Sequence, residues 1–163
     1  MRILLSAILI SLLPILSFAS NLPQADLVVV YKSTRTMALI KDGQPFREYS
    51  ISLGENPQGH KEKEGDKRTP EGEYFLDWRR DGDYYHRSIH ISYPNEEDRE
   101  AARRRGVKPG GMIMIHGIPK MYERVADVLK ERDWTDGCIA LNNEEMNEIW
   151  NLVRDGTPIR IMP

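Results

Sequence analysis

Two residues of the sequence have the types and the spacing of a catalytic nucleophile and its base. Cys138 is the only cysteine of the chain, and it follows the turn-forming residues Thr135, Asp136 and Gly137. His116 ends an apolar run about twenty residues earlier. A single thiol with a histidine elsewhere in the chain is typical of a nucleophile–base pair. We therefore expect Cys138 to attack a substrate and His116 to accept its proton.

The turn before the cysteine favours this hypothesis over a structural one. Most free cysteines are small buried hydrophobic residues, and Cys138 alone would fit that role. A turn that contains a glycine, however, allows backbone N–H groups to converge on a developing oxyanion. The Gly137–Cys138 pair therefore indicates a catalytic turn.

The first 19 residues predict an export signal that is removed. Arg2 gives a positive start, residues 3–16 are largely apolar, and residues 17–19 (Ser-Phe-Ala) form a small-x-small cleavage site. The apolar stretch has only about fourteen residues and contains Pro14, so it is too short to span a bilayer. We expect residues 20–163 to work in the periplasm or cell envelope without a stable membrane span. Exported domains normally pair their cysteines in disulfides, so an unpaired cysteine in such a domain is a candidate reactive thiol.

Size and charge limit the remaining function classes. Residues 20–163 have the length of one ordinary domain. The formal net charge of −2 favours neither nucleic-acid binding nor attachment to an anionic membrane surface.

His86 and His90 are four residues apart, but in a strand such residues lie roughly 13 Å from each other. No cysteine or acidic cluster completes a zinc set, so we expect no metal and no cofactor.

Short β-strands separated by tight turns dominate the chain. Alternating and β-branched runs predict strands over residues 27–31, 36–41, 45–53, 73–78, 88–93, 112–115 and 157–161. Asp42-Gly43 and Asp81-Gly82 are hairpin turn signals. Helices are expected over residues 95–105, over residues 121–132, and after Asn142, which forms a capping-box pattern with Glu145. The pattern predicts one mainly β domain with two or three helices.

Residues 54–68 are rich in glycine and charge, which predicts a long solvated loop of the kind that often acts as a functional lid. We expect His116 and Cys138 to face one groove beneath this loop. The candidates for contacts with substrate are Tyr93, His90, Arg68 and Trp134, with Tyr84 and Tyr85 as further stacking surface.

Several motifs together resemble one known family. They are His116-Gly117, the run from Thr135 to Ile139, the capped helix that leads into residues 153–159 (Val-Arg-Asp-Gly-Thr-Pro-Ile), and upstream residues 52–54, Pro57, Gly59 and 68–74. In this combination, over nearly the whole mature chain, the sequence resembles the L,D-transpeptidase catalytic (YkuD) domain family. Within that family it resembles the YafK-like branch.

The resemblance implies an α+β fold with a mixed β-sheet and a reaction on peptidoglycan stem peptides. In that family the cysteine takes the acyl group of a stem tetrapeptide and passes it to an amine. The resemblance makes Cys138 the nucleophile and His116 the general base. The backbone amides of Gly137 and Cys138 become the oxyanion site, and a carbonyl near Gly117 orients the imidazole. A neighbouring imidazolium is expected to lower the pKa of the thiol.

Departures from the family pattern keep other reactions open. Thr135 replaces the usual serine but retains a hydroxyl that can brace the turn, and Ala140 stands where many relatives carry an arginine. Asp136 adds a negative charge that opposes ionisation of the thiol. An amidase or peptidase that hydrolyses cross-links or protein–murein links is therefore an alternative. An inactive murein-binding module and a redox-sensing thiol are alternatives of other classes, and the latter would need no His116.

Overall fold

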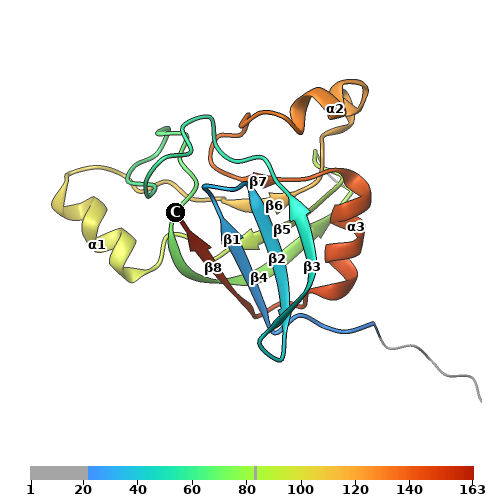
Figure 1. Cartoon of the computed structure of the whole chain (residues 1–163). Helices are drawn as coiled ribbons and strands as arrows, with labels where there is room; N and C mark the ends of the chain where they lie inside the picture. Colours follow the sequence, from blue (N-terminus) through green and yellow to red (C-terminus); the bar gives the residue numbers. More distant parts are fainter. Residues whose placement is uncertain (1–21, 83) are drawn as a thin grey trace, which may run out of the picture.

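The computed structural model describes residues 22–82 and 84–163 (Figure 1). The predicted export signal, residues 1–19, lies outside the described residues. Among the residues that are described, no helix has the length and apolar character needed to cross a membrane.

A mixed β-sheet forms the body of the domain, as predicted. Its strands across the described chain are β1 (Leu27–Tyr31), β2 (Thr36–Lys41), β3 (Gln44–Ser50), β4 (Gly72–Asp81), β5 (Arg87–Ile91), β6 (Met114–His116), β7 (Ile139–Ala140) and β8 (Thr157–Met162). They lie in the order β3-β2-β1-β8-β4-β5-β6-β7. The β1–β8 and β6–β7 pairs are parallel and the others are antiparallel.

The first hairpin forms where the sequence predicts it. Asp42 and Gly43 both have positive φ angles, 51° and 76°. Positive φ at both central residues is the requirement of a two-residue type I′ turn, which matches the twist of the flanking strands. Pro45 lies near the start of β3 at the edge of the sheet, where a missing N–H is tolerated.

The third strand ends at Ser50 rather than at the predicted Leu53. After Ser50 the chain leaves the hairpin, because the backbone of Ser52 exchanges two hydrogen bonds with Ala140, each 2.9 Å long. This bridge connects the first hairpin to β7. The side chains of Ile51 and Leu53 are nevertheless buried.

Two helices begin at the predicted caps. Helix α1 (Glu96–Arg104) follows Asn95 and helix α3 (Asn143–Leu152) follows Asn142, and a capping box closes each N-terminus. Helix α3 packs against β5 beside the sheet (Figure 1). Its fully buried side chains are Met146, Ile149 and Leu152.

The predicted helix over residues 121–132 is wrong in its extent. The segment forms a 3-10 helix, η1 (Lys120–Val125), and then one α-helical turn, α2 (Ala126–Leu129). Neither element has a side-chain cap or a buried residue. Tyr122 and Val125 are 38% and 46% exposed. So short a segment, without a buried face, lacks the packing that stabilises most helices in proteins.

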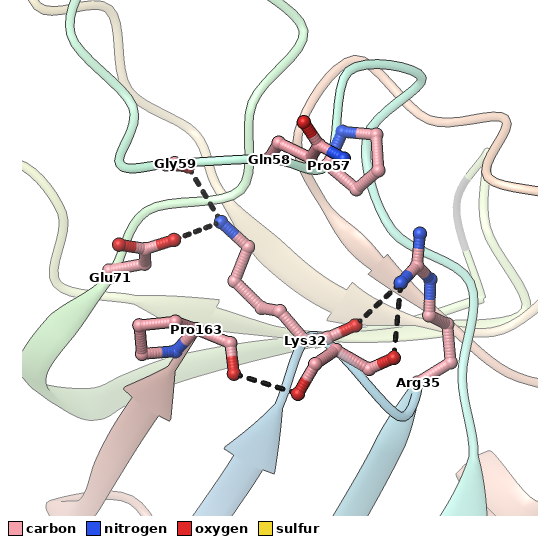
Figure 2. A pocket seen from close by; sticks show the side chains of 8 residues that line it. Lys32, Arg35, Pro57, Gln58, Gly59, Glu71 and Pro163 are labelled. Atoms are coloured by element: carbon pink, nitrogen blue, oxygen red, sulfur yellow. Dashed lines mark hydrogen bonds and ion pairs between the residues drawn. The ribbon is translucent and has the colours of Figure 1, made fainter.

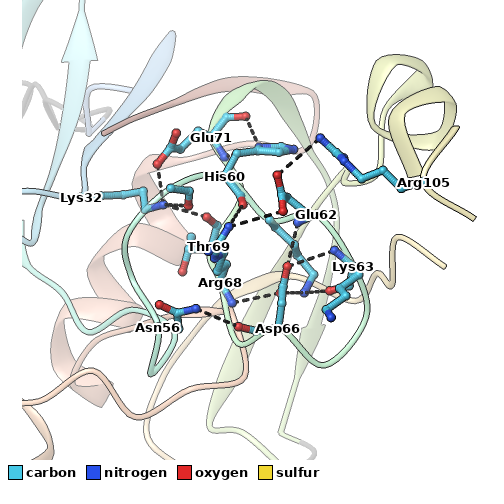
Figure 3. Close-up of polar contacts among 12 residues, drawn as sticks. Lys32, Asn56, His60, Glu62, Lys63, Asp66, Arg68, Thr69, Glu71 and Arg105 are labelled. Carbon is cyan, nitrogen blue, oxygen red and sulfur yellow. Dashed lines mark hydrogen bonds and ion pairs between the residues drawn. The ribbon is translucent and has the colours of Figure 1, made fainter. Parts of the chain in front are cut away.

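The loop of residues 54–68 is largely exposed, as predicted, but buried charges anchor it. The carboxylate of Asp66 accepts a hydrogen bond from the Nζ atom of Lys61 at 2.8 Å, and the two side chains are only 8% and 3% exposed. It also accepts hydrogen bonds from three backbone N–H groups of the loop, those of Glu62, Lys63 and Arg68. Figure 3 shows how these contacts converge on Asp66.

A second buried cation ties the end of this loop to the sheet. The Nζ atom of Lys32 donates to the Gly59 carbonyl at 2.7 Å, to the Thr69 carbonyl at 2.9 Å and to the Glu71 carboxylate at 2.8 Å. Lys32 directly follows β1 and lines a pocket of about 360 Å³ (Figure 2). Neither Cys138 nor His116 lines this pocket.

Replacement of Asp66 by asparagine should lower the free energy of unfolding at pH 7 by about 1–2 kcal/mol, because a hydrogen-bonded charge is lost. Burial opposes ionisation of the Asp66 carboxyl, but the Lys61 ammonium and the backbone N–H groups outweigh burial and hold its pKa at about 2. The stability that comes from this depressed pKa is present above the ordinary aspartate pKa of about 4. It is lost as the pH falls through about 2.

Urea denaturation at a series of pH values measures this difference. The stability difference between the wild-type protein and the Asp66→Asn variant should shrink below about pH 4. It should disappear as the pH falls through about 2. Glu64→Gln removes an exposed carboxylate from the same loop and should have no measurable effect. A stability difference that stays constant with pH, or an equal loss in both variants, would contradict the assigned role of Asp66.

Candidate active site

Strands β6 and β7 bring His116 and Cys138 to neighbouring positions. The strands pair in parallel, with Ile115 opposite Ile139 and His116 opposite Ala140. Cys138 directly precedes β7, so it lies one strand across from His116 and two residues along. This register separates their Cα atoms by on the order of 8 Å. Residues two apart in a strand point to the same face, so if the extended backbone continues to Cys138 we expect both side chains on one face of the sheet.

The imidazole of His116 is buried and neutral. Its Nδ1 atom lies 2.8 Å from the Gly117 carbonyl, which can only accept, so Nδ1 carries the proton and Nε2 has the free lone pair. Nε2 is buried, and no group of the described residues hydrogen bonds to it. Burial lowers the pKa of His116 to about 4. The Gly117 contact is the one that the resemblance led us to expect.

Two aromatic rings hold the imidazole in place. Tyr85 stacks on His116 with ring centroids 3.8 Å apart and an interplanar angle of 27°. Trp134 meets the same ring edge-on at 5.8 Å. The pKa of the Tyr85 hydroxyl is raised to about 12, first by burial and then by Cys138. Tyr85 therefore contacts the imidazole and lies within electrostatic range of the thiol.

The hydroxyl of Thr135 closes the turn that carries Cys138. It accepts a hydrogen bond from the Gly137 N–H at 3.1 Å and donates one to the Cys138 carbonyl at 2.8 Å. The Gly137 N–H is therefore already engaged in the free protein. The N–H of Cys138 remains the candidate oxyanion donor of this pair.

Two glycines allow the loop of residues 54–68 to pack directly on this turn. A Cβ atom at Gly137, whose φ is +128°, would lie 2.6 Å from the Arg68 carbonyl oxygen. A Cβ atom at Gly54 would lie 2.1 Å from the Lys67 carbonyl oxygen and 3.0 Å from the Cα atom of Gly137. Contacts this short exclude a larger residue at either position. The loop and the cysteine turn therefore form one packed unit.

The thiol of Cys138 is protonated at neutral pH in the free protein. Its Sγ atom lies 3.7 Å from the Met112 carbonyl oxygen. Burial raises the pKa of the thiol, and Asp136 raises it further, whereas the Met114 N–H and Lys61 lower it without reversing the shift. The expectation that an imidazolium lowers this pKa is therefore wrong for the resting site, because His116 is itself neutral.

The other predicted residues fall into two groups. Trp134 contacts His116, and Arg68 lies against the Gly137 turn through its carbonyl group. Tyr93 is buried, with its hydroxyl donating to the Pro109 carbonyl at 3.0 Å. His90 stacks on the Trp78 ring and lies 2.7 Å from the Asp77 carboxylate. The hydrogen bonds and ring contacts of Tyr93 and His90 thus involve neither His116 nor Cys138.

Sequence reasoning missed two residues that position this site. Tyr85 was expected only as stacking surface for substrate, and its contact with His116 crosses from the segment after β4 to the end of β6. The Asp133 carboxylate accepts a hydrogen bond from the Leu53 N–H at 2.9 Å and pairs with Arg35, joining the segment before the cysteine turn to the first hairpin. No local pattern marks either contact. Within the described residues no group of three or more His, Cys, Asp or Glu side chains is placed to hold a metal ion.

Comparison with known proteins gives consistent results. A family model described as the L,D-transpeptidase catalytic domain (YkuD) matches residues 25–161. YqjB of Bacillus subtilis is 28% identical over 166 residues, which cover 99% of this chain and 85% of that protein. YafK of Escherichia coli is 29% identical over 133 residues, which cover 77% of this chain and 46% of that protein. Both relatives are provisionally named as L,D-transpeptidases.

A solved structure is also similar. Pgp2 of Campylobacter jejuni, described as a helical cell shape determining protein, superposes with a TM-score of 0.64 and 30% sequence identity. The match covers 83% of this chain and 46% of the Pgp2 chain. The chain thus spans about half the length of YafK and of Pgp2.

Neutralisation of Asp136 should make the thiol more reactive. Asp136 is exposed and raises the thiol pKa, so Asp136→Asn should lower that pKa and increase the thiolate fraction below it. We expect iodoacetamide to alkylate Cys138 about two to three times faster at pH 7 in this variant. Loss of the exposed Asp127 carboxylate on α2, in Asp127→Asn, should leave the rate unchanged. An unchanged or slower rate in Asp136→Asn would show that its charge does not reach the sulfur.

Proposed function

The chain belongs to the L,D-transpeptidase catalytic domain (YkuD) family, and we propose that it is an exported peptidoglycan L,D-transpeptidase with Cys138 as nucleophile and His116 as base. The Nε2 atom of His116 carries the most weight. It is a buried lone pair without a partner among the described residues, on the strand beside Cys138. A buried polar atom without a hydrogen-bond partner lowers stability, and a role in catalysis would explain why the fold keeps one here.

The first chemical step is attack on a stem tetrapeptide. The sulfur of Cys138 forms a bond to the carbonyl carbon of the third residue, and its proton passes to Nε2 of His116. The oxyanion accepts hydrogen bonds from backbone N–H groups, with that of Cys138 as our candidate. The amide C–N bond then breaks. The terminal D-amino acid leaves with the proton from His116, and a thioester remains on Cys138.

The neutral state of both groups fits this sequence of events. A thiol with a raised pKa next to an imidazole with a lowered pKa does not form a stable ion pair at rest. The proton instead transfers as the sulfur attacks, which is general base catalysis. The Nδ1–H contact to Gly117 and the stacked Tyr85 ring keep Nε2 aimed at one place throughout.

The second step releases the acyl group to an amine of another stem peptide. Nε2 of His116 accepts a proton from the amine as its nitrogen attacks the thioester carbonyl. The new amide bond forms, the C–S bond to Cys138 breaks, and the sulfur recovers its proton from Nε2. Transfer to an amine requires that water be excluded. The packed loop of residues 54–68, which closes over the Gly137 turn, supports this requirement.

The cell envelope is the proposed place of action. The signal pattern of residues 1–19 predicts export, and peptidoglycan is the substrate that the family name implies. Pgp2 is described as a determinant of helical cell shape. By analogy with Pgp2, we propose that this chain acts in cell wall biogenesis and affects cell shape.

Hydrolysis by the same two residues is the second candidate. Asp136 places a negative charge beside the thiol and Ala140 supplies no positive one. A site short of positive charge holds carboxylate-bearing stem peptides less firmly. The thioester would then react with water, and the enzyme would trim stem peptides or cleave cross-links.

Product analysis distinguishes the two reactions. Purified protein is given tetrapeptide muropeptides in one experiment and cross-linked dimers in another, and the products are separated by mass. We expect tetrapeptides to yield dimers joined through the third residue. The Cys138→Ala variant should yield none, because no thioester can form.

The other outcomes are equally clear. If both substrates yield only monomers, and the Cys138→Ala variant does not form these products, the enzyme is a hydrolase and not a transferase. Tight binding of muropeptides without any product would indicate a binding module and would end the enzymatic proposal.

A further inference from the structure

The proposed mechanism gives His116 a positive charge that the fold must stabilise. When the Cys138 sulfur attacks, its proton passes to Nε2, and the ring becomes an imidazolium although the residue is only 1% exposed. A buried charge without a partner is costly. In enzymes with a Ser-His-Asp triad, a carboxylate beside Nδ1 stabilises that charge. Here Nδ1 contacts the Gly117 carbonyl, and within the described chain no carboxylate pairs with the ring.

The Tyr85 ring lies face to face with this imidazole. The two ring centroids are 3.8 Å apart and the planes are inclined by only 27°, so the rings are stacked rather than edge to face. An aromatic face carries partial negative charge and attracts a cation within about 6 Å of its centroid. The attraction is stronger where water is excluded, and Nε2 of His116 is buried. The Tyr85 face therefore offers the imidazolium a negative potential that neither water nor a carboxylate supplies.

Contacts of the neighbouring backbone fix Tyr85 in this place. The residues before β5 lie beside the end of β6, because these two strands pair in antiparallel fashion. The Gly117 N–H donates to the Arg87 carbonyl at 3.0 Å, and a Cβ atom at Gly117 would lie 3.2 Å from the Cβ atom of His86. The Nε2 atom of His86 lies 2.8 Å from the side-chain oxygen of Asn147 on α3. The segment that carries Tyr85 is thus held against the strand that carries the base.

We propose that Tyr85 is a positioning residue whose ring face stabilises the imidazolium of His116 as the proton leaves the Cys138 sulfur. The role rests on the proposed function, in which Cys138 is the nucleophile and His116 the base. Tyr85 takes the place that the carboxylate has in a Ser-His-Asp triad. A carboxylate beside the ring would favour the imidazolium before any substrate binds. An aromatic face stabilises the cation without adding a second buried charge.

Alkylation of Cys138 by iodoacetamide tests this role without a peptidoglycan substrate. The sulfur bonds to the CH₂ carbon and iodide leaves. Near pH 7 the thiol is protonated, so its proton passes to Nε2 of His116 and the imidazolium forms. Near pH 11 hydroxide takes the proton and the base is not needed. The ratio of the rate near pH 7 to the rate near pH 11 therefore reports how well the imidazolium is stabilised, and His116→Ala should lower it.

Substitutions at position 85 change the charge of the ring face and preserve its shape. Tyr85→Phe keeps the face and should keep the ratio within about twofold of the wild-type value. Phenylalanine analogues at this position with one or three ring fluorine atoms have progressively less negative faces. The ratio should fall in steps, to roughly a tenth of the Tyr85→Phe value with three fluorine atoms.

The neighbouring Tyr84 supplies the matched control. It is exposed, and its ring meets the Tyr85 ring edge-on with centroids 5.0 Å apart. The same series of phenylalanine analogues at Tyr84 should leave the ratio unchanged, because the charge on that face does not act on the imidazolium. An equal decrease for both positions would overturn the assignment of this role to Tyr85.

The remaining outcomes separate this proposal from the proposed function. A constant ratio across the fluorine series at position 85, while His116→Ala still slows the reaction near pH 7, would overturn the role of Tyr85 and leave His116 as the base. Equal decreases near pH 7 and near pH 11 would also overturn it, because the ring would then only shape the site. A His116→Ala variant with the wild-type rate near pH 7 would contradict the proposed function itself, and the role of Tyr85 would fall with it.

Discussion

The parallel pairing of two very short strands is the constraint on which this site depends. Strands β6 and β7 contain three and two residues, too few to be stable alone. They are held because β6 pairs with β5 on one side and Ala140 exchanges backbone bonds with Ser52 on the other. A slip of one residue would turn His116 and Cys138 to opposite faces. The surrounding packing therefore determines whether the thiol and the imidazole share one face.

Burial then sets the protonation states of that pair. An imidazole with a pKa near 4 and a thiol with a raised pKa are both neutral across the physiological range. The free lone pair on His116 Nε2 and the thiol proton of Cys138 are the state that a general base requires before attack. Asp136 shifts this balance further against the thiolate. The thiol therefore stays protonated and weakly reactive until a substrate carbonyl binds beside it.

Local chemistry made much of the fold predictable, and long-range packing limited the rest. The Asp42-Gly43 hairpin and the Asn142 capping box follow from signals within a few residues, and the structure contains both. The family motif likewise pointed to the cysteine turn. The buried Lys61–Asp66 pair was not predictable, because a run of charged residues normally indicates exposure. The stacking of Tyr85 on His116 joins distant segments and has no sequence pattern.

Intact-mass spectrometry of protein quenched in acid during reaction with a stem tetrapeptide tests the proposed chemistry most directly. We expect the wild-type chain to gain the mass of the acyl part of the donor, located on a peptide that contains Cys138, between about pH 5 and pH 8, where His116 is neutral. The His116→Ala variant should form this adduct roughly a hundredfold or more slowly. An adduct that forms at the same rate without His116, or that forms on another residue, would contradict the assignment of the pair.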